Sequence, residues 1–578
     1  MPGVAAAQQE IAYSVTIVGA DDDELQDLLE QSSQLVELKD RPPGSVARLR
    51  VRANGDVERL TKTLRSQGYY DGKVEVALDA QAQPATVSLL VAPGPVYALA
   101  GFTARFKGGP PLAAEQMPLL SKVGLATGTP AQAAAILSAE SQVVAHLRQN
   151  GFPLAKRLGH EALLYRDSRT LKVAVDIDPG PRARFGKVVV DGLELVELAH
   201  VRRQIPWRTG ERYDERLVQQ ARRKLSADPL FGSAAVSPAG QVNPDGTVDV
   251  AVSLREADRR SIGAGVSYST DIGPGANVFW EHRNLFGEGE KLRLSLSAAL
   301  NEQVAEANYT DASVGDGRYT LFSDFSLENR MLDAYDERAA TLTTALQWSL
   351  GDYWTTRAGI SLELQEIEDE TDPEPQQFFL VGLPLSVNRD DTDDRLNPTR
   401  GSRLSVSLTP YAGAGTRFVN FVSATLGGSA YYGIDPDGRF VLAGRARVGS
   451  LVGEPVADIP ADKRFYAGGG GSIRGYEFQS VGPLDSDNDP TGGRSLLEFS
   501  GELRIRLTDT IGIVPFVDAG TVAESEYPTL EEELQWAAGL GLRYYTAIGP
   551  LRADIAVPLN KRDFDDEFQF YVSLGQSF

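Results

Sequence analysis

The stretch Glu567–Phe578, EFQFYVSLGQSF, alternates apolar and polar residues. Since successive side chains of a strand point to opposite faces, the pattern predicts a strand with one apolar face. A soluble sheet can carry the same alternation, but about three hundred preceding residues repeat it in lengths of about ten residues, the span that a tilted strand needs to cross a bilayer. The sequence therefore predicts an outer-membrane β-barrel. The apolar face carries Phe568, Phe570, Val572, Leu574 and Phe578.

The predicted barrel occupies residues 261–578. At roughly twenty residues per strand and connection, this length gives about sixteen antiparallel strands, an even number that places both barrel termini on the periplasmic side. Leu404, Val406 and Leu408, which alternate with serines, illustrate the pattern. The polar faces would line a lumen, and the long segment around residues 452–494 is the candidate for a plug inside it.

Composition narrows the alternatives. The 578-residue chain carries a net charge of −22, which argues against nucleic-acid binding because that function needs a basic surface. Cysteine is absent, so neither disulfides nor thiolate metal sites are expected. Uninterrupted apolar runs long enough for a membrane helix are missing from the sequence. The start, MPGVAAAQQE, does not read as a signal peptide, so an exported chain would be a mature or trimmed form.

The amino-terminal half predicts three tandem α+β modules. Gly68-Tyr69-Tyr70-Asp71, Gly151-Phe152-Pro153-Leu154 and Pro229-Leu230-Phe231-Gly232 each follow a helical stretch and precede strands. Their aromatic residues recur at intervals of 83 and 79 positions, and such a period indicates repeated domains. Each unit is expected to run strand, helix, helix, strand, strand, with helices segregated on a small mixed sheet. The predicted boundaries are 11–96, 97–181 and 182–257.

Five segments, in order behind the three modules, carry a family resemblance. The chain resembles the outer-membrane assembly superfamily, in which periplasmic polypeptide-transport-associated (POTRA) domains precede a β-barrel. The resemblance covers nearly the whole chain and implies an outer-membrane location with the POTRA domains in the periplasm. The segments are Trp280–Gly287 (WEHRNLFG), Asp394–Gly401 (DRLNPTRG), Ile473–Tyr476 (IRGY), Val514–Gly520 (VPFVDAG) and the terminal Phe578.

Within that superfamily, three modules and this length look most like the TamA family, the outer-membrane subunits of translocation and assembly modules. The segment Gly549–Leu559 also looks like that family. The resemblance implies that this chain helps to insert unfolded, autotransporter-like proteins into the outer membrane. It leaves open whether this insertion is coupled to movement of outer-membrane phospholipid. It also implies a TamB-like, inner-membrane-anchored partner that docks on POTRA domain 1. The alternative is a two-partner-secretion-type pore or a general barrel insertase.

The long loop provides the first candidate site. Gly468–Gly471 allow tight bending, so Arg474, Gly475 and Tyr476 could reach the inner wall. On the later strand, Phe516, Asp518 and Gly520 share one face, and a carboxylate there suits a guanidinium. In the family the matching motifs make this contact, so the resemblance implies that Arg474 and Asp518 lock the loop. The alternative is a solvated Arg474 and a merely lumen-lining Asp518.

The second candidate site is a lateral seam between the first and last barrel strands. Residues 261–268 alternate correctly, but Gly263 and Gly265 contribute little packing and leave strand pairing weakly determined. A seam formed with Gly575 and Phe578 could open and let an incoming strand add to the exposed edge. The alternative is that the small residues only fit a narrow wall.

Neither catalysis nor a cofactor is predicted. The four histidines, at positions 146, 160, 200 and 282, lack the spacing of a metal site or a catalytic base. Asp485–Asp489 begins like a calcium loop, but Pro490 stands where the turn glycine is required. We therefore expect a protein that is not an enzyme and binds no metal.

Overall fold

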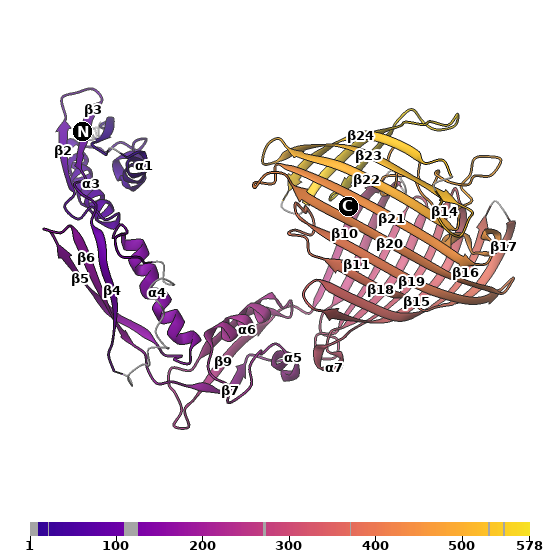
Figure 1. Ribbon diagram of the computed structural model, residues 1–578, viewed down its shortest axis with the longest axis horizontal. Helices are drawn as coiled ribbons and strands as arrows, with labels where there is room; N and C mark the ends of the chain where they lie inside the picture. Colours follow the sequence, from indigo (N-terminus) through magenta and orange to yellow (C-terminus); the bar gives the residue numbers. More distant parts are fainter. Residues whose placement is uncertain are drawn as a thin grey trace, which may run out of the picture. The chain divides into compact units, whose positions relative to one another are not determined.

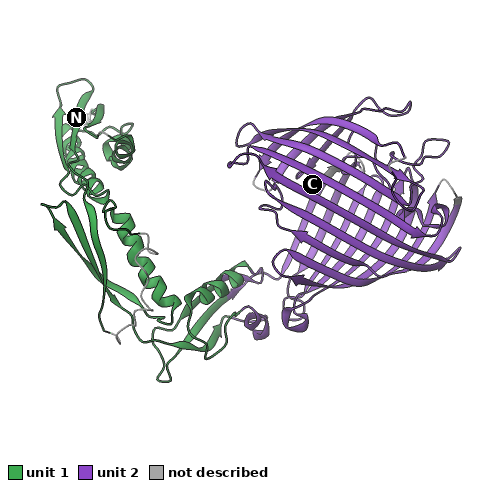
Figure 2. Ribbon diagram, viewed as in Figure 1, with its two compact units in different colours: residues 1–192, 205–227, 234–254 green, residues 193–204, 228–233, 255–578 purple. Residues whose placement is uncertain are grey.

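The computed structural model describes residues 10–20, 22–108, 125–269, 273–369, 372–529, 532–546 and 549–578. The chain divides into two compact units (Figure 2). The first comprises residues 1–192, 205–227 and 234–254, and the second comprises residues 193–204, 228–233 and 255–578.

Three small mixed sheets follow one another in the amino-terminal half (Figure 1). In the first sheet, the central strand β3 pairs in parallel with β1 and antiparallel with β2. Helix α3 covers this sheet because Leu49, Ala53, Leu60 and Leu64 recur at helical spacing and are buried. Its elements are β1 (Tyr13–Val18), α1 (Asp23–Ser32), α2 (Gln34–Glu37), α3 (Val46–Ser66), β2 (Lys73–Asp79) and β3 (Ala85–Ala92).

The second and third sheets repeat this plan. Their strand orders are β4-β6-β5 and β7-β9-β8, again with the last strand in the centre and parallel to the first. The three α+β sheets agree with the predicted fold class, whereas the exact domain boundaries stay a prediction. The elements are β4 (Ala98–Phe106), α4 (Ala133–Gln149), β5 (Lys156–Tyr165), β6 (Thr170–Asp178), β7 (Arg184–Asp191), α5 (Leu198–Arg203), α6 (Glu215–Ala227), β8 (Phe231–Pro238) and β9 (Thr247–Glu256).

The carboxy-terminal half is a single antiparallel sheet whose strands pair in sequence order from β10 to β26. Strands β17 (Asp372–Gly382) and β18 (Leu385–Asp390) both pair with β16 and β19, so they are two halves of one strand. The interruption contains Pro384, which has no N–H for a ladder hydrogen bond. Counting the halves as one gives the sixteen predicted strands, and the fold class is confirmed.

The barrel strands are longest in the middle of the sheet and shorter at its ends. Short elements α7 (Val314–Gly317), η3 (Val456–Asp458) and η4 (Ala461–Lys463) lie in connections. The strands are β10 (Arg260–Ser269), β11 (Gly273–His282), β12 (Lys291–Ala299), β13 (Glu302–Asp311), β14 (Thr320–Leu332), β15 (Tyr335–Leu350), β16 (Trp354–Asp369), β19 (Gly401–Gly415), β20 (Val419–Gly433), β21 (Phe440–Gly453), β22 (Ser495–Arg506), β23 (Ile511–Ala523), β24 (Gln535–Thr546), β25 (Gly549–Pro558) and β26 (Gln569–Leu574).

Alternation divides the barrel wall into an apolar outer face and a polar inner face. Ile262 and Val266 are 84% and 90% exposed, although both are large and apolar. Residues between such positions, for example Glu498 and Glu502 on β22, are buried and point inward. None of the helices in the described part of the chain combines the length and apolar character needed to span a membrane.

Candidate functional site

The loop between β21 and β22 folds back and is buried. Isolated bridges between Phe465 and Gly493 and between Ala467 and Val481 draw its two arms together. At its turn, Ile473 and Tyr476 are almost completely inaccessible to solvent. The segment predicted as a plug is therefore packed inside rather than spread over the surface.

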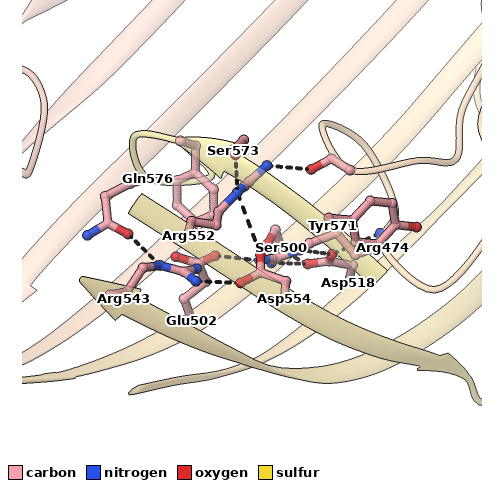
Figure 3. A network of polar contacts seen from close by, with 12 residues as sticks. Arg474, Ser500, Glu502, Asp518, Arg543, Arg552, Asp554, Tyr571, Ser573 and Gln576 are labelled. Atoms are coloured by element: carbon pink, nitrogen blue, oxygen red, sulfur yellow. Dashed lines mark hydrogen bonds and ion pairs between the residues drawn. The ribbon is translucent and has the colours of Figure 1, made fainter. Parts of the chain in front are cut away.

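Arg474 at the turn of this loop pairs with Asp518 on β23 (Figure 3). Arg474 Nε donates to Asp518 Oδ2 at 2.7 Å, and Nη2 donates to Oδ1 at 3.0 Å, so the contact is bidentate. The backbone N–H of Arg474 also donates to Asp518 Oδ2, at 3.1 Å. The guanidinium carbon lies 3.4 Å from the centre of the Phe516 ring, a cation–π contact. Three hydrogen bonds and one cation–π contact thus fix Arg474, one of them through its backbone.

Two further carboxylates complete the surroundings of Arg474. Arg474 Nη1 lies 3.1 Å from Asp554 Oδ2 on β25 and 2.9 Å from Glu502 Oε1 on β22. Each of the three carboxylates is almost fully buried. A buried charge is tolerated only when it is paired and hydrogen bonded, and here Arg504 contacts Glu502 while Arg543 contacts Asp554. Arg474 is therefore the central cation of a network that joins three strands.

The sequence prediction missed Glu502 and Asp554. A signal was present, because Glu502 and Arg504 on β22, like Arg552 and Asp554 on β25, are charged residues two positions apart with an apolar residue between them. That spacing places both members of each pair on one face. The spacing does not indicate which strand faces the loop.

The glycine and tyrosine after Arg474 tie the loop to the last strand. Gly475 N–H donates to the Tyr571 hydroxyl on β26 at 3.1 Å, and that hydroxyl donates to the Tyr476 carbonyl at 2.9 Å. Tyr476 in turn donates its hydroxyl proton to the Asn560 side chain or the Trp536 carbonyl, at 2.9 and 3.1 Å. The predicted residues Arg474, Gly475 and Tyr476 thus each contact a different part of the wall.

Gly520, the last residue predicted for this site, lies beneath Ile473 of the loop. A Cβ added at Gly520 would come within 2.8 Å of Ile473 Cδ1 and 2.5 Å of the Leu497 carbonyl oxygen. The glycine therefore makes room for the turn of the loop.

A second anchor holds the beginning of the loop against β16. Arg464 Nη2 lies 2.8 Å from Asp369 Oδ2, and Lys463 forms an ion pair with Glu363. Gln365 Nε2 donates to Asp462 Oδ1 at 3.2 Å. The sequence prediction did not include this anchor, because no family motif or period marked residues 462–464.

The first and last strands of the sheet approach each other without forming a ladder. The sheet begins at β10 and ends at β26, and within the described ranges no register joins the two. Gly263 lies opposite Phe279 and Gly265 opposite Asn277 on β11, and neither adds a side chain to the inner face. Strand β26 has 6 residues, compared with 16 in each of β15 and β16. The predicted seam therefore lies where the wall is short and its edges are unpaired.

The expectation that Phe578 shares the outer face of the last strand is wrong. Strand β26 ends at Leu574, and Gly575 has a φ of +99°, which turns the chain. The Phe578 ring lies 6.2 Å from the Tyr431 ring on β20, and its carbonyl accepts a hydrogen bond from Arg504 Nη2 at 3.0 Å. Phe578 therefore packs against the inner wall formed by β20–β22.

The turn between β11 and β12, which includes the Trp280–Gly287 segment, packs against helix α5 within the second compact unit. Asn284 Nδ2 donates to the Leu195 carbonyl at 3.0 Å, and Arg203 Nη1 lies 2.7 Å from Glu288 Oε2. His200 contacts the Glu288 carbonyl through Nδ1 at 2.7 Å and Asp228 Oδ2 through Nε2 at 2.6 Å.

The environment of His200 favours its protonated form. Burial opposes protonation, but the hydrogen bond and charge of Asp228 and the Glu288 carbonyl outweigh it, so the pKa of His200 is raised above its ordinary value. Both ring nitrogens face acceptors, and only the imidazolium can donate from both at once.

The chemistry available at these sites is binding and anchoring. Across the described ranges, no group of three or more His, Cys, Asp or Glu side chains could hold a metal ion. The buried carboxylates Asp518, Asp554 and Glu502 are each paired with arginine instead.

Comparisons with known proteins give one family. The model of the Omp85 superfamily domain matches residues 284–578. Outer membrane protein assembly factor BamA of Nitratidesulfovibrio vulgaris is 26% identical over 434 residues, covering 71% of this chain and 54% of that protein. The corresponding protein of Neisseria meningitidis serogroup B is 22% identical over 483 residues, covering 71% and 59%. This chain thus spans less than two thirds of the length of either relative.

A solved structure shares the fold. BamA from Haemophilus ducreyi lacking POTRA domains 1–3 has a TM-score of 0.72 at 20% sequence identity, covering 82% of this chain and 99% of that one. The likeness includes the sixteen-stranded antiparallel barrel.

Proposed function

The chain belongs to the Omp85 superfamily, and on that premise we propose that it helps to insert and fold substrate proteins into the outer membrane, without acting as an enzyme. It is an outer-membrane β-barrel protein with periplasmic POTRA domains. Its relatives are named as outer-membrane protein assembly factors.

The observation that carries the proposal is the unpaired edge between β10 and β26. An unpaired strand edge presents backbone N–H and C=O groups on which another strand can form a ladder. Inside a bilayer these groups have no water to bond, so an edge that opens favours the addition of a substrate strand. Gly263, Gly265 and Gly575 would keep the closed seam weak, since glycine adds no packing.

The anchored loop acts in this proposal as a lock beside the seam. Tyr571, on the last strand, bonds to the loop at Gly475 and Tyr476, directly after Arg474. Movement of β26 would therefore strain the turn that Arg474 and Asp518 hold. We assign Arg474, Gly475, Tyr476, Phe516, Asp518 and Gly520 to this lock.

The finer identity is that of a TamA-like subunit serving autotransporter-like substrates. The resemblance of Gly549–Leu559 supports this branch. A TamB-like, inner-membrane-anchored partner would dock on POTRA domain 1, where the strand order β1-β3-β2 leaves β1 and β2 as sheet edges able to accept a strand. Such a partner would also connect the barrel to phospholipid movement. Pulldown of the tagged full chain from its native envelope tests this identity, and recovery of a lipoprotein-containing insertase complex without a TamB-like protein would contradict it.

A disulfide across the seam tests the function. Cysteines replacing Gly263 and Gly575 in the otherwise cysteine-free chain should, when oxidised, stop insertion of a substrate barrel into proteoliposomes, and a reductant should restore it. The control joins Ser407 and Thr425, whose hydroxyl oxygens on the paired strands β19 and β20 are 2.5 Å apart. Full activity of the oxidised seam variant would eliminate the seam mechanism. High, stable conductance of the unmodified chain in planar bilayers would favour a secretion pore.

A further inference from the structure

An apolar hollow lies on the outer face of strands β10–β14, on one side of the seam. Its volume is about 450 Å³. The hollow exists because Ala305 and Ala307 on β13 are small, whereas the neighbouring strands present larger side chains on the same face. The large outward-facing lining residues are Ile262, Val278, Trp280, Leu294, Leu296, Phe325 and Leu327.

The depth of this hollow in the membrane follows from its aromatic residues. Ile262, Trp280, Leu294 and Ala307 form one row across the paired strands. Tryptophan and tyrosine concentrate where the hydrocarbon meets the headgroups. Tyr309 lies in the next row, towards the end at which β10 begins. Since β10 follows the periplasmic POTRA domains directly, this end of the hollow lies at the periplasmic leaflet.

A positive charge lies at the same depth as the headgroups. Arg260 is exposed and belongs to the row of Tyr309, one outward position before Ile262. The neighbouring cations Arg283, Lys291 and Arg293 all contact Glu281. Lys291 and Arg293 alternate with the outward-facing Leu292 and Leu294, so they lie on the inner face of the wall and not beside the hollow. Among the residues that the structure describes, Arg260 has no ion-pair partner. Its guanidinium is therefore available to an anion at the membrane surface.

We infer that this hollow and Arg260 together bind one anionic glycerophospholipid of the periplasmic leaflet. An acyl chain fills the space above Ala305 and Ala307, and the headgroup phosphate accepts hydrogen bonds from Arg260. This inference goes beyond the proposed function, because it requires only the barrel in its membrane and not insertion activity. A lipid held at this position would lie against β10, one edge of the seam.

Lipid retention by the full chain tests the site. Native mass spectrometry after release from nanodiscs of phosphatidylglycerol and phosphatidylethanolamine counts the lipids that remain bound. We expect about a fivefold preference for phosphatidylglycerol, the size of one basic contact at a membrane surface. Arg260→Gln should remove the preference, whereas Arg338→Gln, which alters an exposed arginine on β15, should keep it. An unchanged preference in Arg260→Gln, or an equal loss in Arg338→Gln, would overturn the inference.

Filling the hollow gives an independent test. Ala307→Phe should reduce retention of both lipids, whereas Ala424→Phe on the outer face of β20 should not. Folding of each variant is checked by its heat-dependent migration in gels, and Ala305→Leu fills the same hollow with less bulk if Ala307→Phe does not fold. Retention that is unchanged in a folded hollow-filling variant would contradict the acyl-chain position.

Discussion

Arg474 reaches both carboxylate oxygens of Asp518, 44 positions later in the chain, with neither side chain more than 1% exposed. Burial makes this pair an anchor rather than a surface contact. Surface ion pairs contribute at most about 1 kcal/mol, whereas removing one partner of a buried pair costs about 3–5 kcal/mol because a charge is left without compensation. The turn of the loop is therefore held in place because separating Arg474 from Asp518 would leave buried charges without their partner.

Asp518→Asn should loosen the loop without unfolding the barrel. The amide keeps the shape of the side chain but removes one negative charge, and Arg474 retains Asp554 and Glu502. We expect hydrogen exchange at residues 465–482 to accelerate by about 100-fold, corresponding to roughly 3 kcal/mol. Asp487→Asn, in the exposed part of the same loop, is the matched control. Equal exchange in the two variants would show that the pair does not anchor the loop.

Arg464→Gln tests the second anchor. The substitution removes the ion pair between Arg464 Nη2 and Asp369 Oδ2, which are 2.8 Å apart, so residues 456–466 should exchange faster while residues 472–476 stay protected. Sites that share no partner contribute additively, so the double variant with Asp518→Asn should show the sum of the two effects. A coupling energy above about 0.5 kcal/mol would instead show that the loop releases as one unit.

The sequence was sufficient for the architecture because each predicted element had its own periodic signal. Alternation located the strands, and the recurring aromatic motifs located three modules. The contact between Arg474 and Asp518 was also predictable, but only through family motifs. Glu502 and Asp554 were not predicted, since the partner of a loop residue depends on which strand faces it.

The error at Phe578 has a local cause. The alternation of side chains placed Phe578 on the face of Phe570 and Val572, on the assumption that the strand continues to the end of the sequence. Side chains alternate in this way only while the backbone stays extended. One residue, Gly575 at a φ of +99°, ends the strand and redirects Phe578 to the inner wall.

Gly475→Ala should weaken the lock through the backbone. Gly475 has a φ of +107°, and an added Cβ would lie 2.8 Å from Ala537 Cβ and 3.2 Å from the Val557 carbonyl carbon. The left-handed backbone alone costs about 1–2 kcal/mol for alanine. Gly471→Ala is the control, because its added Cβ meets no atom within 4 Å and needs no positive φ. Exchange at residues 472–478 should rise in the first variant alone, and similar rates in both would contradict the steric argument.

The contact between α5 and the β11–β12 turn should weaken as the pH rises. The pKa of His200 is raised in the folded chain, chiefly because Asp228 overcomes the effect of burial, and Arg203 opposes it only in part. A raised folded-state pKa means that the contribution of His200 is complete below the ordinary value of 6.5 and is lost as the pH passes the folded-state value. Hydrogen-exchange protection of residues 197–204, corrected for intrinsic rates, should therefore be constant below pH 6.5 and fall as the pH rises above that value. His200→Gln should be less protected at low pH and should lose this dependence, while Gln204 and Glu288 remain in place. Protection that follows the same pH profile in both proteins would assign the effect to another group.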